Sequence, residues 1–475
     1  MVSVNRCPGC RREVCDGCGI YRKLNTNKQV KINFPKGFKV RPEKGLGISF
    51  DVGTTTLAGM LWDLEKGTLL EAETGANPQA MFGADVISRI QAAAGSRDDL
   101  KKMQIMLVEK LDEMASAMAG SLTIRKVTVA GNTAMSEILL GIPPLRLSGA
   151  PFCPDYENTV YLKGSALGFR FLREADIIML PPIGGYVGAD ALGVHGYVSM
   201  EEKDGRILSI DIGTNGEILL QCGRKRFACS TAAGPALEGG AVSQGMRAAQ
   251  GAVDMVSLTG RFPMEDLTSR VIGGGAGRGI CGSGLVDSLA WLYRTGVIDH
   301  TGYMRDGREA RQSGTPGRIA GRIREGRDGR RFLLTDDQNP VYLTAGDVRQ
   351  LQLSVSAIRS GAEVLMEKAG TKAEQLDRIY LAGAFGCYIG IESGLAIGLF
   401  PHVPKEKICQ AGNLAGMGAA MALLSADALK YMEEESREII HVELAVEETF
   451  RELFPAYMNF PLKICETMTE RNQRK

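Results

Sequence analysis

Two aspartates in matching sequence contexts are the residues of this chain best suited to chemistry. Asp51 lies within GISFDVGTTTLAGML, residues 47–61, and Asp211 lies within ILSIDIGTNGEILL, residues 207–220. In each copy the aspartate follows a short apolar run, which predicts a buried strand, and a second apolar run follows a few residues later. The repeated unit is therefore a strand, a turn and a second strand, with a carboxylate where the turn begins.

The turns between these strands have the composition of an anion-binding site. A glycine two residues after each aspartate permits a tight turn and a close approach of backbone to ligand. Successive backbone N–H groups in such a turn form a concavity for an anion, and neighbouring hydroxyls add donors. The residues expected to contact phosphate are Gly53, Thr54, Thr55, Thr56, Gly213, Thr214, Asn215 and Gly216.

A carboxylate beside these turns would repel phosphate, but it can hold Mg²⁺, usually through water. We therefore expect Asp51 and Asp211 to position Mg²⁺ on a bound nucleotide and to act as catalytic residues. One copy alone would also fit an ordinary β-hairpin with a glycine turn. Two copies in matching contexts favour a duplicated fold that holds the nucleotide between its halves.

The pair of turns resembles the two phosphate motifs of the actin, sugar kinase and Hsp70 superfamily. This resemblance implies an α/β fold: a duplicated actin-like (RNase H-like) two-lobe ATPase that binds ATP. It also implies an adenosine motif late in the chain, and IYLAGAFGCYIG, residues 379–390, fits it. The expected adenosine contacts there are Gly383, Ala384 and Phe385.

The superfamily would also supply two hinge helices of small residues. GGYVGADALG, residues 184–193, and GNLAGMGAAMALL, residues 412–424, are similar to such helices. Glycine and alanine at helical spacing would let the two helices pack closely. Two other helices are expected from their apolar periodicity and caps, over residues 96–120 and 344–365.

Four cysteines near the N-terminus form a C-x2-C-x4-C-x2-C pattern, with Cys7, Cys10, Cys15 and Cys18 as the candidate metal ligands. Short spacings of this kind suit a [4Fe–4S] cluster, which takes four cysteines from one loop. A structural zinc site and a reactive dithiol are the alternatives. We favour the iron–sulfur cluster, although the spacing differs from the usual bacterial ferredoxin run.

The remaining divisions of the chain follow from composition. Residues 21–44 are basic and contain prolines, which indicates either a solvated linker or a tether that lets the cysteine segment swing. Residues 300–340 are rich in arginine and glycine, and we expect an exposed excursion there. The expected units are a cysteine segment at 1–20, a basic linker at 21–44, a first lobe at 45–198, a second lobe at 199–461 and a polar tail at 462–475.

Whole-chain composition limits the partners. The formal net charge is +1 over 475 residues, so general attraction to nucleic acid is not indicated. Neither a membrane-spanning apolar run nor an apolar signal segment is found, so we expect a cytoplasmic protein without a membrane partner. The eleven cysteines then point to metal or redox use. The sequence leaves a homodimer open.

Three glycine-rich stretches narrow the resemblance to one branch of the superfamily. They are CSTAAGPALEGGAVSQGMRAAQGAV at residues 229–253, RGICGSGLVD at 278–287 and AGAFGCYIGIESGLAIGLFP at 382–401. Together with the strand and helix of residues 126–152, they resemble the ATP-dependent reductive activators of corrinoid proteins. The residues that would then border the nucleotide are Gly234, Pro235, Glu238, Gly282 and Ser283.

This resemblance implies an activity and its partners. An iron–sulfur cluster, supplied by an external low-potential electron donor, would reduce the Co(II) of a corrinoid protein to Co(I) for methyl transfer, and ATP would drive the step. Glu238 would orient Mg²⁺ or water, or it would merely complement a helix dipole. The larger ferredoxin-type domain typical of the family is replaced here by the short cysteine segment.

Three other functions fit parts of the sequence. A small-molecule kinase of the same fold would use the cysteines as a structural zinc knuckle. An actin-like scaffold would use nucleotide to switch assembly. An activator of a radical dehydratase shares the combination of ATP and cluster, but four cysteines in one short segment argue against it.

Overall fold

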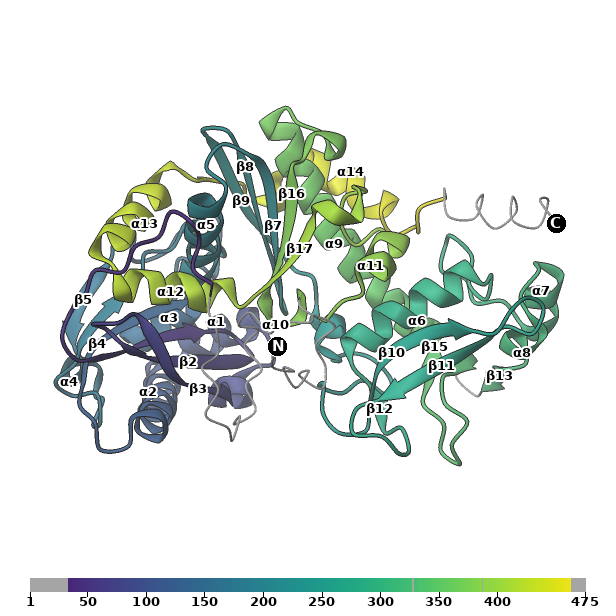
Figure 1. Ribbon diagram of the computed structural model, residues 1–475, viewed down its shortest axis with the longest axis horizontal. Coiled ribbons are helices and arrows are strands. Elements are labelled where there is room, and N and C mark those ends of the chain that lie inside the picture. The colour runs from purple at the N-terminus through teal and green to yellow at the C-terminus, as the bar shows by residue number, and fades with distance from the viewer. Residues whose placement is uncertain (1–32, 327–328, 387, 463–475) are drawn as a thin grey trace, which may run out of the picture.

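The fold is built on two six-stranded sheets (Figure 1). The structure is a computed structural model that describes residues 33–326, 329–386 and 388–462. The first sheet has the order β3-β2-β1-β4-β6-β5. Its strands are β1 (Leu46–Val52), β2 (Thr56–Asp63), β3 (Thr68–Ala76), β4 (Ile124–Gly131), β5 (Val160–Lys163) and β6 (Asp176–Met179).

The second sheet repeats the plan of the first, with the order β17-β16-β7-β8-β9-β18. Its strands are β7 (Arg206–Ile212), β8 (Gly216–Cys222), β9 (Lys225–Thr231), β16 (Arg378–Ala382), β17 (Ile408–Gly412) and β18 (Ile440–His441). In each sheet an antiparallel three-stranded meander is followed by a strand that pairs in parallel with the first strand of the meander. The predicted duplication is confirmed.

Helices cover the first sheet. These are α1 (Val86–Gly95), α2 (Arg97–Ala119), α3 (Thr133–Leu140) and the short η1 (Pro78–Phe82) and α4 (Gly164–Leu167). The predicted helix over residues 96–120 is confirmed as α2: Ser96 accepts a hydrogen bond from the N–H of Asp99, and the helix ends at Gly120. Its apolar face, including Met103, Leu107 and Leu111, is buried in the core of this lobe.

Two small-residue helices cross between the sheets, as predicted for the hinge. They are α5 (Ala189–Glu201) and α12 (Leu414–Leu424). A Cβ atom at Gly418 would lie 2.2 Å from the Cα of Gly193, so only glycine allows this approach. Although α12 comes late in the chain, it packs on the first sheet, where Thr128 donates a hydrogen bond to the Ala419 carbonyl (Figure 1). The next helix, α13 (Ala426–Glu438), lies against α5.

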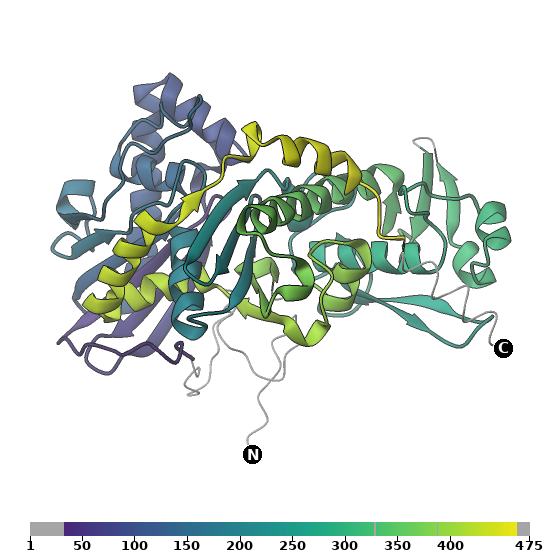
Figure 2. The same cartoon turned by 90° about the horizontal axis from the view of Figure 1, so that it is seen from above.

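A third unit is inserted in the second half and extends the molecule on the far side of the second sheet (Figures 1 and 2). It holds the three-stranded sheets β11-β10-β12 and β13-β14-β15. Its strands are β10 (Ala252–Thr259), β11 (Asp266–Val271), β12 (Gly279–Ile280), β13 (Ile323–Gly326), β14 (Gly329–Leu333) and β15 (Tyr342–Thr344). Its helices are α6 (Gly282–Arg294), α7 (Gly307–Gln312) and α8 (Gly317–Ala320).

This unit corrects the expectation for residues 300–340. The arginine-rich stretch is not a loose excursion, because Ile319, Phe332 and Leu334 are buried in the same core as the second sheet. Arginines of this stretch pair with acids, as the mostly buried Arg322 does with Asp266 at 3.0 Å.

The remaining helices cover the second sheet. They are α9 (Ala345–Ala369), α10 (Gly383–Gly386), α11 (Ile391–Ile397), α14 (Glu448–Ala456) and the short η2 (Pro235–Glu238), η3 (Ala373–Gln375), η4 (Lys405–Lys407) and η5 (Leu444–Val446). The helix predicted over 344–365 is confirmed as α9, which starts at a capping box formed by Thr344 and Asp347. Among the described residues no helix is long and apolar enough to cross a membrane.

The segment before the first sheet, residues 33–44, packs against the folded body, and we call it the N-terminal strap. The ring of Phe34 lies 5.7 Å from that of Trp62 in β2, between ring centroids. Lys36 pairs with Glu201 of α5 at 3.0 Å, and the N–H of Arg41 donates to the carbonyl that ends α12. The expectation of a solvated linker or swinging tether is therefore wrong for this part of the chain, because apolar rings anchor it to both hinge helices and the first sheet.

Candidate nucleotide-binding site

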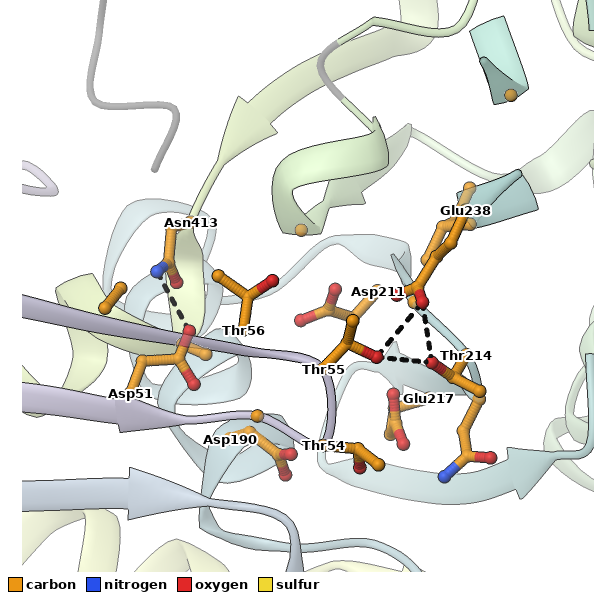
Figure 3. A pocket seen from close by; sticks show the side chains of 18 of the residues that line it. Asp51, Thr54, Thr55, Thr56, Asp190, Asp211, Thr214, Glu217, Glu238 and Asn413 are labelled. Carbon is orange, nitrogen blue, oxygen red and sulfur yellow. Dashed lines mark hydrogen bonds between the residues drawn. The ribbon is translucent and has the colours of Figure 1, made fainter. Parts of the chain in front are cut away.

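The turns of the two hairpins face one another across a cleft between the sheets (Figure 3). Its cavity volume is about 270 Å³, near the lower end of the range of about 300–1,000 Å³ usual for small-molecule sites. The predicted residues that line it are Asp51, Gly53, Thr54, Thr55, Thr56, Asp211, Gly213, Thr214, Asn215, Glu238, Gly282, Ser283 and Gly383. Segments more than 300 residues apart in the chain, Asp51 and Gly383 among them, thus meet at one place.

Several predicted residues are not among those that line the cleft. Gly216 is buried in β8, where a Cβ would lie 2.8 Å from the hydroxyl of Thr231, so its function is to allow strand packing. Gly234 and Pro235 begin the short turn η2 that carries Glu238. Ala384 and Phe385 belong to α10, and the structure does not describe their side chains. Cys7, Cys10, Cys15 and Cys18 lie outside the described residues, so their metal site stays a prediction.

Glu238 bridges the two halves of the cleft. Its carboxylate accepts a hydrogen bond from the Thr55 hydroxyl at 3.1 Å and from the Thr214 hydroxyl at 2.9 Å (Figure 3). The two hydroxyls are themselves 3.1 Å apart. The loop that carries Glu238 forms only the single turn η2, so Glu238 links the turns of the two hairpins rather than complementing a helix dipole.

Sequence reasoning missed several residues that line the cleft: Asp190, Glu217, Arg247 and Asn413. Asp190 lies in the first turn of α5, and Asn413 caps α12 and donates from its amide to Asp51 at 2.9 Å (Figure 3). A signal for Glu217 was present, because it is an acid at the start of an apolar strand; it pairs with Asp211 where the first hairpin pairs the buried Ala58 with Asp51. The side chain of Asn132 caps α3 and lines the cleft as well.

Four carboxyl groups come together at this cleft, with Glu217 buried and Asp51, Asp190 and Asp211 partly buried, and their pKa values are raised. Burial, with the nearby charges of Asp51 and Asp190, raises the pKa of Asp211 to about 8. Burial and the charge of Asp190 raise the pKa of Asp51 to about 7, against the opposing hydrogen bond from Asn413. Burial raises the pKa of Asp190 to about 6. Burial and the charges of Asp190 and Asp211 hold the pKa of Glu217 well above its usual range.

Such a cluster fits a divalent cation brought in with a nucleotide. The charges that raise one another's pKa values would be offset by a cation placed among them. Among the described residues no three His, Cys, Asp or Glu side chains are arranged to enclose a metal ion directly. Mg²⁺ is usually held by one or two carboxylates with water and substrate phosphates, so the donor set suits Mg²⁺ on ATP better than a fully protein-bound metal. Asp51 and Asp211 would hold it, and Mg²⁺ would offset phosphate charge.

Two duplicated sheets, crossing hinge helices and a cleft between two aspartate-bearing turns define the ASKHA class of two-lobe folds. Residues 206–471 match the family described as the C-terminal domain of RACo, the ASKHA domain, and residues 46–203 match the RACo middle region. The chain therefore belongs to the RACo family.

Named relatives agree with this assignment. The chain is 34% identical to the corrinoid activation enzyme RamQ of Eubacterium limosum, covering 86% of this chain and 69% of the relative. It is 26% identical to a [Co(II) methylated amine-specific corrinoid protein] reductase of Methanosarcina barkeri, covering 89% of this chain and 79% of the relative. A solved structure described as a reductive activator for corrinoid, iron-sulfur protein superposes with a TM-score of 0.77 at 32% identity, covering 89% of this chain and 67% of that chain.

Proposed function

We propose that this protein is an ATP-dependent reductive activator of a corrinoid protein. The observation that carries the proposal is the meeting of the two aspartate-bearing turns at one cleft, in a chain of the RACo family. The relatives whose names state an activity act on corrinoid proteins, in one case as a Co(II) reductase.

At the cleft, the chain would bind the phosphates of ATP through the turn N–H groups and the hydroxyls of Thr55 and Thr214. Asp51 and Asp211 would orient Mg²⁺, and Glu238 would exchange its threonine contacts for the nucleotide or a water. Positioning and electrostatics supply most of the catalysis in phosphoryl transfer, so the absence of a histidine among the residues that line the cleft is no obstacle.

Nucleotide binding would change the angle between the lobes. Glu238 links the two turns directly, and α5 and α12 cross between the two sheets, so both connections must respond when a nucleotide enters. A partner that binds one lobe arrangement preferentially shifts the population towards it. We propose that the ATP-bound arrangement binds the Co(II) partner productively and that hydrolysis releases it.

The electron would come from the cysteine segment. Cys7, Cys10, Cys15 and Cys18 would hold a cluster, favoured as [4Fe–4S], that receives one electron from an external low-potential donor. One electron passed to the partner converts Co(II) to Co(I), while ATP and water become ADP and phosphate. The cobalt belongs to the partner and is the substrate of this reaction.

The test is ATP hydrolysis by the anaerobically purified chain, measured with and without a Co(II) corrinoid protein. We expect slow hydrolysis by the chain alone and faster hydrolysis with the partner, because the partner stabilises the hydrolysis-competent arrangement. Stimulation by a small metabolite and none by any corrinoid protein would replace this proposal with a kinase of the same fold.

A further inference from the structure

The segment that follows the first hairpin donates hydrogen bonds to the backbone carbonyls of the hairpin's turn. The segment runs through η1 and α1, and it includes Asn77 and Arg89. The side-chain amide of Asn77 donates to the Gly53 carbonyl at 2.9 Å, and the Asn77 N–H donates to the Thr55 carbonyl at 3.0 Å. A guanidinium nitrogen of Arg89 donates to the Thr54 carbonyl at 2.6 Å. Three successive carbonyls of the turn are therefore held from behind.

Holding the carbonyls orients the N–H groups. The peptide bonds of this turn are trans, and in a planar trans peptide the C=O and the next residue's N–H point in opposite directions. With the carbonyls of Gly53 and Thr54 turned towards the segment, the N–H groups of Thr54 and Thr55 are turned towards the cleft. Successive N–H groups presented in this way form an anion-binding concavity.

Arg89 adds a positive charge behind this concavity. Its side chain is 1% exposed, and it also donates to the Gly83 carbonyl at 3.0 Å. Among the described residues no carboxylate forms an ion pair with it, and the nearest acid, Asp85, acts only at longer range while it caps α1. Burial lowers the pKa of Arg89 to about 10, so it remains charged at neutral pH.

A buried cation without a carboxylate partner is costly unless another negative charge offsets it. Thr54, which Arg89 contacts, lines the cleft, so the anion that would offset this charge is one bound at the turn. Of the two turns, the one that Asn77 and Arg89 contact is the first, through the carbonyls of Gly53, Thr54 and Thr55.

We propose that Arg89 and Asn77 are positioning residues that preorganise the first turn for the phosphates of a bound nucleotide. This inference rests on the proposed function only in that the cleft binds a phosphorylated nucleotide. Donation by a charged guanidinium to the Thr54 carbonyl polarises the peptide and strengthens the next N–H as a donor. Arg89 thereby acts on phosphate without touching it.

The experiment compares binding of Mg·ADP and of adenosine to the full chain by calorimetry. Arg89→Met should weaken Mg·ADP binding by on the order of tenfold to a hundredfold, the range for a lost charged hydrogen bond, and should leave adenosine binding unchanged. Arg89→Lys keeps the positive charge but loses the planar set of guanidinium N–H donors. Its Mg·ADP affinity should therefore lie between those of Arg89→Met and the wild type.

Two further variants separate positioning from folding. Asn77→Ser keeps a side-chain acceptor for the Gln79 N–H at the start of η1 but removes the donor to the Gly53 carbonyl. It should therefore weaken the binding of Mg·ADP and leave the binding of adenosine unchanged. Arg322→Met, which removes a mostly buried arginine of the inserted unit, should leave both affinities unchanged.

Equal losses for Mg·ADP and adenosine in Arg89→Lys and Asn77→Ser, or wild-type Mg·ADP affinity in Arg89→Met, would overturn the inference. Failure of the wild type to bind Mg·ADP would overturn it together with the proposed function. Normal Mg·ADP binding without any response to a corrinoid protein would contradict the proposed function alone and leave the assignment of the turn standing.

Discussion

Partly or fully buried acids dominate the chemistry of the cleft. Asp51, Asp190, Asp211 and Glu217 line it, and each has a raised pKa because burial penalises its charged form. Ionising these carboxyl groups costs free energy when no cation is bound. A bound cation lowers that cost, because it offsets the repulsion among the carboxylates. The same residues therefore weaken the unliganded fold and favour Mg·nucleotide binding.

In the protein without metal, the raised pKa of these carboxyl groups lowers the free energy of unfolding as pH rises. The pKa of Asp211 is raised from 3.8 to about 8, so the folded form binds more protons than the unfolded form within that window. The free energy of unfolding should fall across it, by up to about 1.4 kcal/mol per pH unit for each such carboxyl. Above about pH 8 Asp211 is ionised in the folded protein as well, and the full free-energy cost of that charge then lowers the stability.

Asp211→Asn should reduce that pH dependence and abolish Mg·ATP hydrolysis, since it removes one of the carboxyl groups with a raised pKa and, on the proposed function, a ligand of Mg²⁺. Urea unfolding at several pH values and an ATPase assay measure the two effects. Asp98→Asn, which removes an exposed carboxylate of α2, serves as the control and should change neither. Wild-type hydrolysis in Asp211→Asn would contradict the assignment of the metal site.

At the scale of elements, the two hairpins and the two hinge helices position these residues. Local patterns predicted all four, because an apolar run with a glycine turn, or glycine and alanine at helical spacing, specifies local conformation directly. Asp190 and Asn413 were missed because each begins a hinge helix whose small residues gave the stronger signal. Only the packing of α12 on the first sheet brings Asn413 to Asp51.

The crossing of the hinge helices makes Gly418 sensitive to any side chain. In Gly418→Ala the new Cβ would meet the Gly193 backbone at 2.2 Å, so the helices must separate. We expect a loss of about 1–3 kcal/mol in the free energy of unfolding, the usual cost of overpacking, together with slower ATP hydrolysis. Gly196→Ala is the control: its Cβ would meet the flexible end of Met432, and it should cost less. Equal stability of the two variants in urea would contradict the close crossing.

At the scale of the whole molecule, the chain is a row of three units with the nucleotide cleft between the first two sheets (Figures 1 and 2). Composition alone misjudged two regions. The arginine-rich stretch packs as part of the inserted unit because several of its apolar residues, Phe332 and Ile319 among them, are buried in the core. Residues 33–44 pack because Phe34 and Phe38 find partners in β2, which no local pattern could indicate.

The N-terminal strap predicts different outcomes for two truncations. A chain that begins at residue 33 should keep wild-type stability and ATP hydrolysis but lose cobalt reduction with the four cysteines. A chain that begins at residue 45 also loses the contacts of Phe34, Lys36 and Arg41, and its free energy of unfolding should fall by on the order of 2–5 kcal/mol. Equal urea midpoints for the two chains would show that the strap contributes nothing to stability.

ATP-driven cobalt reduction can be followed by the absorbance of a corrinoid protein, recorded anaerobically with a strong reductant and catalytic amounts of this protein. We predict that Co(I) accumulates with Mg·ATP and does not accumulate without it, and that Asp211→Asn abolishes the difference. Equal accumulation of Co(I) with and without ATP would show that ATP does not drive the electron transfer, and the proposed function would then be wrong.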